Sequence, residues 1–91
     1  MRLRRRRRSP ILMFYVYVLK SLKNRIRYVG SGEDYFERLR RHNKGEYQFT
    51  KGHLPWELVY TEEYTTRSEA VRRERFLKSG QGRAYLDKIL K

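Results

Sequence analysis

Two short runs built around the tripeptides YVY (residues 15–17) and YVG (residues 28–30) constrain the fold of this chain most. The first run, residues 13–19, is rich in Val, Tyr and Phe, and the second, residues 25–29, alternates basic with apolar side chains. Both patterns are typical of β-strands. Because turn-forming residues occupy positions 21–24 between the runs, we predict an antiparallel hairpin.

A helix and a loop are predicted next. The Gly-Ser-Gly segment at residues 30–32 is expected to break the second strand. Asp34 and Glu37 have the spacing of an N-terminal capping box, which predicts a helix over residues 35–43. Residues 44–55 contain two glycines and a proline and are therefore predicted to form a loop.

The second half of the chain adds a strand and two helices. Residues 56–62 predict a third strand with Trp56, Leu58 and Tyr60 on one face. A second capping box, residues 66–69, opens a helix that we expect to end near residue 78, followed by a final helix over residues 83–90. The order is ββαβαα, which predicts an α/β (α+β) fold: a three-stranded antiparallel sheet flanked by helices.

Length and charge limit the classes of protein to which the chain can belong. Its 91 residues suit one small domain, and the absence of cysteine excludes disulfide scaffolds and thiolate metal sites. The two histidines argue against a multi-histidine zinc site. With 23 Lys and Arg against 10 Asp and Glu, the net charge of +13 favours a nucleic-acid partner over a membrane. We expect a cytoplasmic protein, with a monomer as the default.

The N-terminal residues form a separate basic segment. We interpret residues 1–12 as a disordered arm that precedes a domain spanning residues 13–91. The arm is expected to contact nucleic acid through a run of five arginines: Arg4, Arg5, Arg6, Arg7 and Arg8. A charged tail without function, or upstream sequence included by a wrong start codon, explains the same run equally well.

Two residues of the predicted first helix are candidates for chemistry. Arg38 and His42 are four positions apart and so lie on one face, at the edge of the apolar stripe that contains residues 35, 36 and 39. Arg41 points away from this stripe and is a further candidate for nucleic-acid contact. A surface arginine and a packed histidine remain the alternatives for Arg38 and His42.

The predicted second helix carries a carboxylate where an apolar side chain is expected. Glu74 falls in the middle of the stripe that Ala70, Val71 and Leu77 define. An inward carboxylate is costly unless a cation satisfies it. Two interpretations stay open: Glu74 pairs with a buried arginine such as Arg38, or Glu74 binds a divalent metal ion.

Taken in order, these residues resemble the GIY-YIG nuclease family, which is named for two such tripeptides. The resemblance covers about residues 13–91 and is strongest to small bacterial proteins that consist of this domain alone. Residues 38–39 and 42–43 follow the second tripeptide at the family's spacing, and residues 68–74 are similar to the helix that bears the family's metal-ligating glutamate.

The resemblance implies a divalent-metal-dependent endonuclease that hydrolyses phosphodiester bonds, in DNA rather than RNA, with structured or branched DNA and a role in repair or recombination as further expectations. By position, Tyr17 would activate the attacking water or accept a proton from it, and Tyr28 would orient that water and the phosphate. Arg38 would bind the scissile phosphate, and His42 would assist Tyr17. Glu74 would hold a single Mg²⁺ or Mn²⁺.

The chain departs from the family pattern at three points. Tyr15 replaces the glycine of the first tripeptide, Ser31 stands where repair-type members often carry lysine, and no asparagine follows Asn43. We therefore expect weak activity, with any extra cation supplied from elsewhere. The alternative function is a basic nucleic-acid-binding module that keeps the fold without cutting, and a third is a ribosome-associated basic protein.

Overall fold

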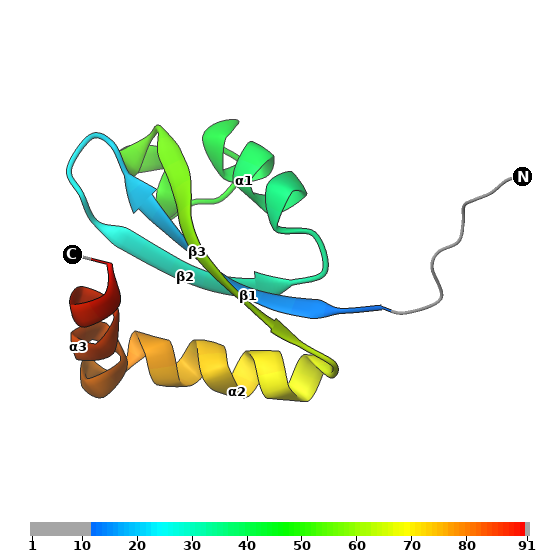
Figure 1. Ribbon diagram of the computed structural model, residues 1–91. Helices are drawn as coiled ribbons and strands as arrows, with labels where there is room; N and C mark the ends of the chain where they lie inside the picture. Colours follow the sequence, from blue (N-terminus) through cyan, green and yellow to red (C-terminus); the bar gives the residue numbers. More distant parts are fainter. Residues whose placement is uncertain (1–11, 91) are drawn as a thin grey trace, which may run out of the picture.

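The computed structural model describes residues 12–90 and confirms the predicted α+β fold with the order ββαβαα (Figure 1). The predicted arm, apart from Leu12, lies outside the described residues. Three strands form one antiparallel sheet in the order β2-β1-β3, so that β1 is central. The elements are β1 (Phe14–Ser21), β2 (Arg27–Gly32), α1 (Tyr35–Asn43), the short 3₁₀ helix η2 (Thr50–His53), β3 (Trp56–Tyr64), α2 (Arg67–Lys78) and α3 (Gly80–Ile89).

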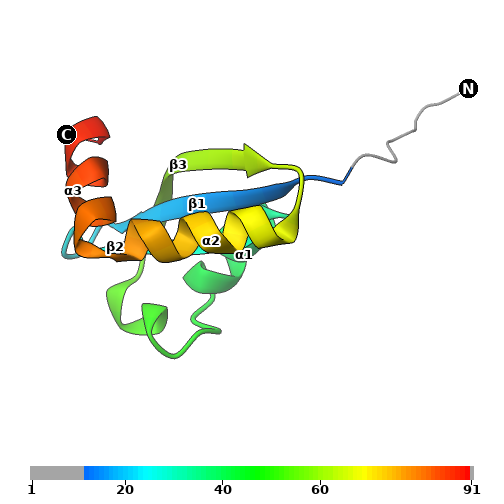
Figure 2. The ribbon, with the colours of Figure 1, turned by 90° about the horizontal axis from the view of Figure 1, so that it is seen from below.

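Helices cover the two faces of the sheet unequally. The helix α1 packs on one face, whereas α2 and α3 pack on the other (Figure 1). Figure 2 shows α2 running along the strands, with α3 beyond its C-terminal end. Because successive side chains of β1 point to opposite faces, Val16 and Val18 enter one core cluster while Tyr17 and Leu19 enter the other. All four side chains are fully buried.

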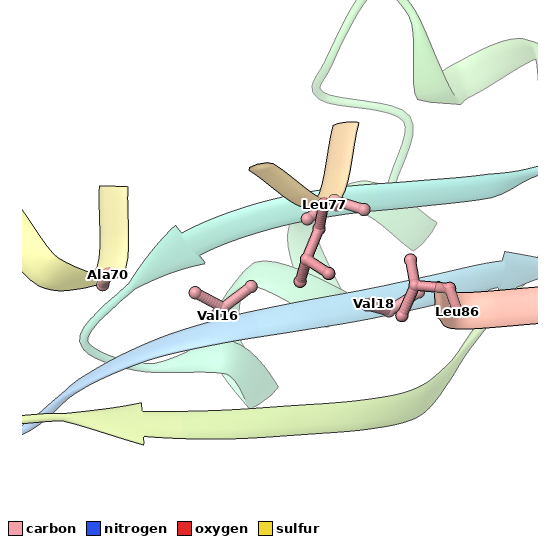
Figure 3. Close-up of a cluster of buried hydrophobic side chains, with 6 residues drawn as sticks. Val16, Val18, Ala70, Leu77 and Leu86 are labelled. Atoms are coloured by element: carbon pink, nitrogen blue, oxygen red, sulfur yellow. The ribbon is translucent and has the colours of Figure 1, made fainter. Parts of the chain in front are cut away.

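The core beneath α2 and α3 is aliphatic. Val16 and Val18 meet Ala70 and Leu77 of α2 and Leu86 of α3 in one buried cluster (Figure 3). This cluster explains why α2 forms where the sequence places it: the apolar residues of the helix have a complementary sheet face to bury. The N-terminus of α2 carries the predicted capping box, in which Thr66 and Glu69 exchange hydrogen bonds.

The strand β2 continues through the Gly-Ser-Gly segment, so the predicted strand break is wrong. Tyr15 pairs with Gly32, Val16 with Ser31 and Tyr17 with Gly30 in the antiparallel register. Glycine weakens a strand, but here it also lets another group approach the backbone closely. The pairing with the central strand β1 therefore outweighs the local preference of the glycines.

A β-bulge in the pairing of β1 with β3 overturns the prediction that Trp56, Leu58 and Tyr60 share a face. Leu19 pairs with Leu58 and Val18 with Tyr60, so β3 has one more residue than β1 at this point. Trp56 and Leu58 consequently pack in the cluster with Tyr17, and Tyr60 packs against the aliphatic cluster on the other face. Trp56 itself is buried, as a core anchor should be.

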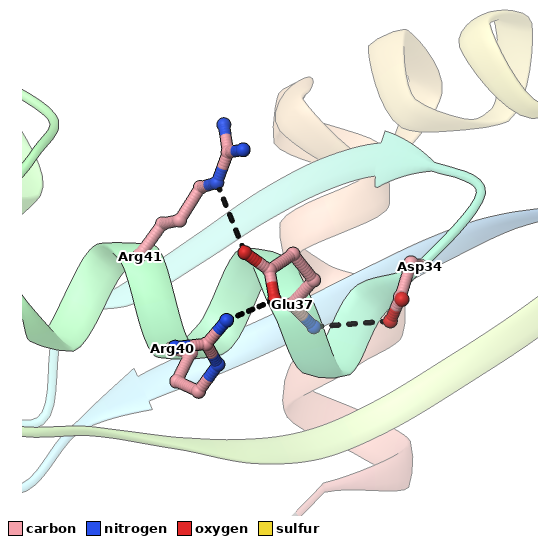
Figure 4. A network of polar contacts seen from close by, with 4 residues as sticks. All are labelled: Asp34, Glu37, Arg40 and Arg41. Carbon is pink, nitrogen blue, oxygen red and sulfur yellow. Dashed lines mark hydrogen bonds and ion pairs between the residues drawn. The ribbon is translucent and has the colours of Figure 1, made fainter.

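The helix α1 has the predicted bounds, and its predicted inward stripe is correct except at Phe36. Asp34 accepts a hydrogen bond from the Glu37 backbone N–H, and Glu37 pairs with Arg40 and Arg41 on the outer surface (Figure 4). Phe36, predicted to face inward, is 66% exposed. Tyr35 and Leu39 face inward as predicted, and His42 is buried with them; their i, i+4, i+7 spacing defines one helical face.

The helix α3 begins earlier than predicted. Ser79 ends α2 and also caps α3, because its side chain accepts a hydrogen bond from the Gly82 N–H. The glycine-containing segment is therefore the first turn of a helix rather than a loop. A Cβ atom at Gly82 would collide with the Phe76 carbonyl oxygen, so the missing side chain permits the close approach of the two helices. Among the apolar residues of α3, Leu86 is buried but Ile89 is exposed.

Candidate active site

Tyr17 occupies the centre of the sheet with no exposed surface. It lies opposite Gly30, and a Cβ atom at position 30 would come within 2.5 Å of the Tyr17 hydroxyl oxygen. The glycine of the second tripeptide is therefore the residue that makes room for the tyrosine of the first. Within residues 12–90, the Tyr17 hydroxyl has no hydrogen-bond partner.

Burial determines the protonation of Tyr17. Desolvation, with a smaller effect from Tyr28, raises the pKa of Tyr17 to about 12, and the nearby charge of Arg38 opposes this rise. The phenol is therefore protonated at neutral pH. In this state Tyr17 is suited to donating a hydrogen bond rather than to accepting a proton.

His42 is the one buried residue of α1 and is kept neutral. Its Nδ1 lies 2.8 Å from Thr50 Oγ1, whereas its Nε2 is buried and has no partner among the described residues. Because the Thr50 hydroxyl also donates to the Tyr47 carbonyl oxygen at 3.5 Å, it is suited to accept from Nδ1–H, which leaves Nε2 as an acceptor. Burial, followed by the charge of Arg38, lowers the pKa of His42 to about 4.

Tyr28 is the tyrosine of the pair that reaches the surface. It is half-buried on the edge strand β2, and its ring centre lies 6.5 Å from that of Tyr17 and 4.8 Å from that of His42. The ring centre of exposed Phe49 lies 6.3 Å from that of Tyr28. Tyr28 thus connects a buried aromatic cluster to solvent.

A surface cavity of about 1050 Å³ adjoins Tyr28 and Phe49. Apolar side chains such as Val29 and Leu86 form part of its wall. Its cationic residues come from the β1–β2 hairpin and from the C-terminal helices: Lys20, Arg25, Arg27, Lys78 and Arg83. The acidic residues of the wall, Glu57 and Asp87, are fewer, so the cavity is basic and partly apolar. Such a surface is suited to a nucleic-acid strand.

Arg38 is placed by α1 at the opposite end of β2 from Tyr28. A Cβ atom at Gly32 would lie 3.4 Å from its Nη2, so the guanidinium rests against the glycine at the end of β2. Arg38 makes no ion pair with any residue of the described chain, 12–90. Its charge therefore remains available to an anion near Tyr17 and His42.

Glu74 approaches from the other face of the sheet. One carboxylate oxygen accepts a hydrogen bond from Ser31 Oγ at 2.6 Å, and the other lies 2.7 Å from Lys78 Nζ. Its side chain is only 20% exposed. Arg38 is not its partner, so the predicted arginine alternative is wrong; the cation that pairs with Glu74 is a lysine one helical turn away.

Three consecutive residues at the end of β2 bring the candidates together. Gly30 lies against Tyr17, Ser31 bonds Glu74, and Gly32 lies against Arg38. Side chains of β1, α2 and α1 thereby contact consecutive residues of β2, with Glu74 on one face of the sheet and Tyr17 and Arg38 on the other. Arg41 does not join them, because it lies on the outer surface of α1, paired with Glu37. The five arginines of the arm lie outside the described residues.

The residues present fit a metal ion that keeps most of its own water. Residues 12–90 contain no cluster of three or more Asp, Glu or His side chains able to enclose an ion. Glu74 is a single, partly exposed carboxylate whose orientation Ser31 fixes. Mg²⁺ is typically bound by one or two carboxylates together with water and substrate oxygens, so this donor set suits it better than a fully enclosed site would.

Three of the contacting residues were missed by sequence reasoning. Lys78 carried a detectable signal, since it follows Glu74 by four positions in a helix. Ser31 was noticed only as a departure from the family pattern, because the predicted strand ended before it. Thr50 carried no signal, since its contact with His42 depends on the path of a loop.

Comparison with known proteins identifies the class. The chain belongs to the GIY-YIG catalytic domain family, a family of nucleases, whose model matches residues 13–85. A UPF0213 protein of Staphylococcus epidermidis is 41% identical over 66 residues, covering 71% of this chain and 79% of the relative. A UPF0213 protein of Staphylococcus aureus is 38% identical over 66 residues, which again cover 71% of this chain and 79% of the relative.

A solved structure agrees with these relatives. The solution NMR structure of the UPF0213 protein of Bacillus halodurans has 30% sequence identity to this chain. The two structures superimpose with a TM-score of 0.53, and the match covers 86% of this chain and 85% of the Bacillus halodurans chain. The predicted membership in the GIY-YIG family and the likeness to its small bacterial members are thus confirmed. Among residues 12–90, no helix is long and apolar enough to cross a bilayer.

Proposed function

We propose that this protein is a divalent-metal-dependent endonuclease that hydrolyses phosphodiester bonds, preferentially in DNA. The observation that carries the proposal is the meeting of Tyr17, Arg38 and Glu74 at consecutive residues of β2. A phenol, a guanidinium and a carboxylate from three separate elements have no common structural reason to meet there. Phosphoryl transfer requires such a set, because catalysis of this reaction rests on positioning and on electrostatic stabilisation.

The burial of the two tyrosines favours a distribution of roles different from the one that the family resemblance implies. Tyr28 lines the cavity and can contact a water molecule beside a bound strand, so we assign it the role of orienting the attacking water. Tyr17 is enclosed and protonated, so we assign it a hydrogen-bond donor role. Neutral His42, next to both rings, supplies a buried proton acceptor.

We assign Arg38 the role of binding the scissile phosphate. Its guanidinium has no carboxylate partner in the described part of the chain, and it adjoins the buried phenol. A guanidinium binds phosphate oxygens through two parallel hydrogen bonds, which fixes the phosphate as well as neutralising it. Glu74 would hold the Mg²⁺ or Mn²⁺, which when bound supplies stabilisation of charge on the leaving oxygen.

The nucleic acid is proposed to follow the basic cavity past Tyr28. Cationic side chains of the hairpin and of α2 and α3 line this path, and Phe49 offers an exposed ring on which a base can stack. A role for the arginine arm remains part of the proposal. Removing residues 1–10 should flatten the slope of log K against log salt by about 0.9 for each phosphate of duplex DNA that the arm neutralises.

A binding module without activity is the second candidate. Its supporting observation is the pairing of Glu74 with both Ser31 and Lys78, which satisfies the carboxylate without a metal ion. The two candidates differ in one test. Labelled duplex, branched and single-stranded DNA and RNA are incubated with the protein in EDTA, Mg²⁺ or Mn²⁺. Metal-dependent cleavage supports the endonuclease, whereas binding of the same substrates without cleavage in either metal supports the module.

A further inference from the structure

Lys78 stands in the candidate site although no motif points to it. Its Nζ lies 2.7 Å from Glu74 Oε2 and 5.6 Å from the centre of the Tyr28 ring. The ammonium group thus lies close both to the proposed metal ligand and to the ring of the tyrosine assigned to the attacking water. Lys78 also lines the basic cavity, where its side chain is 48% exposed.

An ordinary ion pair between neighbouring helical turns explains only part of this arrangement. Glu and Lys four residues apart commonly pair on a helix surface. Such a pair does not require Glu74 to be locked by Ser31 from the adjacent strand, nor the ammonium to sit over the ring of Tyr28. The pair is therefore built into the site rather than placed beside it.

We propose that Lys78 is an exchangeable counter-ion: it neutralises Glu74 in the free protein and moves to a substrate phosphate when a divalent ion takes the carboxylate. The inference rests on the proposed function, since it assumes that Glu74 accepts a metal ion. A divalent cation at Glu74 repels the neighbouring ammonium. The long, flexible lysine stem then lets Nζ turn toward the cavity, where phosphate is the nearest expected anion.

This exchange also brings a cation to the edge of β2. Ser31 is uncharged, and its hydroxyl holds Glu74. Lys78 brings a positive charge to the same strand edge from α2. Serine at position 31 and lysine at position 78 therefore act together: one fixes the carboxylate and the other neutralises it until the metal ion arrives.

The first test measures metal binding by the free protein. Mn²⁺ is titrated into wild type, Lys78→Met and Lys78→Arg, and the free ion is followed by its EPR signal. Removing the competing ammonium should tighten the Kd for Mn²⁺ at least about threefold in Lys78→Met, whereas Lys78→Arg keeps the competitor and should stay close to wild type. The control is Lys88→Met, an exposed lysine of α3 outside the cavity wall. Unchanged or weaker Mn²⁺ binding by Lys78→Met overturns the proposal.

The second test detects the moved lysine without requiring cleavage. The binding of duplex DNA is measured against salt concentration in EDTA and in Ca²⁺, for wild type, Lys78→Met and Lys88→Met. In Ca²⁺, Lys78→Met should flatten the log K against log salt slope by about 0.9 relative to wild type, the value for one phosphate that is no longer neutralised. In EDTA, where the wild-type Lys78 ammonium stays paired with Glu74, the slopes of wild type and Lys78→Met should agree.

Each outcome is decisive. Equal slope differences in EDTA and Ca²⁺ mean that Lys78 does not exchange, and no difference in either means that it does not touch phosphate; both overturn the proposal. A protein that shows the metal-dependent difference but cuts none of the substrates keeps the exchange and loses the proposed nuclease activity. The failure of the inference and the failure of the function are thereby separated.

Discussion

The two faces of the sheet are built from different chemistry. Beneath α2 and α3, Val16, Val18 and Leu77 form an aliphatic cluster, whereas beneath α1 the buried side chains include Tyr17 and His42. Both buried side-chain atoms without a partner in residues 12–90, Tyr17 Oη and His42 Nε2, lie on the α1 face. Burying a polar group without a partner is destabilising. The α2 face therefore stabilises the fold, and the α1 face carries groups that stability alone does not explain.

Glu74 lies on the α2 face, bonded to Ser31 of the edge strand, and its replacement should have the largest effect on activity. Glu74→Gln is expected to abolish cleavage, because the neutral amide loses the metal ion. Its stability should change by less than about 1 kcal/mol, since the ion pair removed is with a half-exposed lysine and the amide oxygen still accepts from Ser31. Single-turnover cleavage and a urea melt measure both quantities.

The matched control for this change is Glu33→Gln. Glu33 is an exposed carboxylate that pairs with Arg67 at 2.8 Å and forms no ion pair, among residues 12–90, with a residue assigned to the reaction. It should retain full activity. Cleavage by Glu74→Gln at the wild-type rate, or a collapse of its melting temperature with activity preserved in the cold, would show that Glu74 is a structural residue.

Truncation on the aliphatic face should have the largest effect on stability. Leu77 is fully buried among Val16, Val18 and Leu86, so Leu77→Ala is expected to lower the free energy of unfolding by about 2–5 kcal/mol. Well below its melting temperature, the folded variant should still cut. Exposed Leu22→Ala is the control and should leave the urea midpoint nearly unchanged. A small loss for Leu77→Ala would mean that the aliphatic face is not the main source of stability.

Removing the Tyr17 hydroxyl tests the opposite face. Tyr17→Phe should lower the single-turnover rate by about a hundredfold, the usual scale for losing one positioned hydrogen-bond donor to charge that develops in the transition state. Because the hydroxyl is buried without a partner, its removal should also leave stability unchanged or raise it by about 1 kcal/mol. Opposite signs for activity and stability would mark the residue as functional.

Tyr15→Phe is the control for this substitution. Tyr15 lies on the same face of β1, with its ring edge-on to that of Tyr35 at 5.0 Å. The Tyr15→Phe substitution keeps the ring and removes only the hydroxyl, as Tyr17→Phe does. Normal cleavage by Tyr17→Phe, together with loss of cleavage in Tyr15→Phe, would transfer the role to Tyr15.

Local patterns in the sequence predicted the elements well and their ends less well. The capping residues Asp34 and Thr66 located α1 and α2, because a cap is set by a few neighbouring residues. The continuation of β2 through Gly32 depended on pairing with β1, and the changed face of Tyr60 depended on a bulge in the pairing with β3. Both are properties of the assembled sheet, which no local window contains.

The site followed the same division. The family spacing selected Tyr17, Tyr28, Arg38, His42 and Glu74, and the structure brings side chains of this set to the edge of β2. It did not reveal that Tyr17 is enclosed while Tyr28 is accessible, because burial depends on which strand lies at the sheet edge. Nor did it reveal Thr50 or Lys78, whose contacts arise from the loop path and from helix packing.

The smallest predicted effect concerns pH and again separates the two faces. His42 has its pKa lowered to about 4 in the folded protein, against an ordinary value of 6.5. Between these values the unfolded chain binds the extra proton, so stability falls as pH decreases, by about 2 kcal/mol from pH 7.5 to pH 5. Urea melts at these two pH values should show this loss in wild type and in His53→Gln, which alters the only other histidine. His42→Gln should show much less of the loss, since the side chain that resists protonation is gone. A loss of equal size in His42→Gln would place the titrating group elsewhere and would mean that the α1 face does not keep His42 neutral.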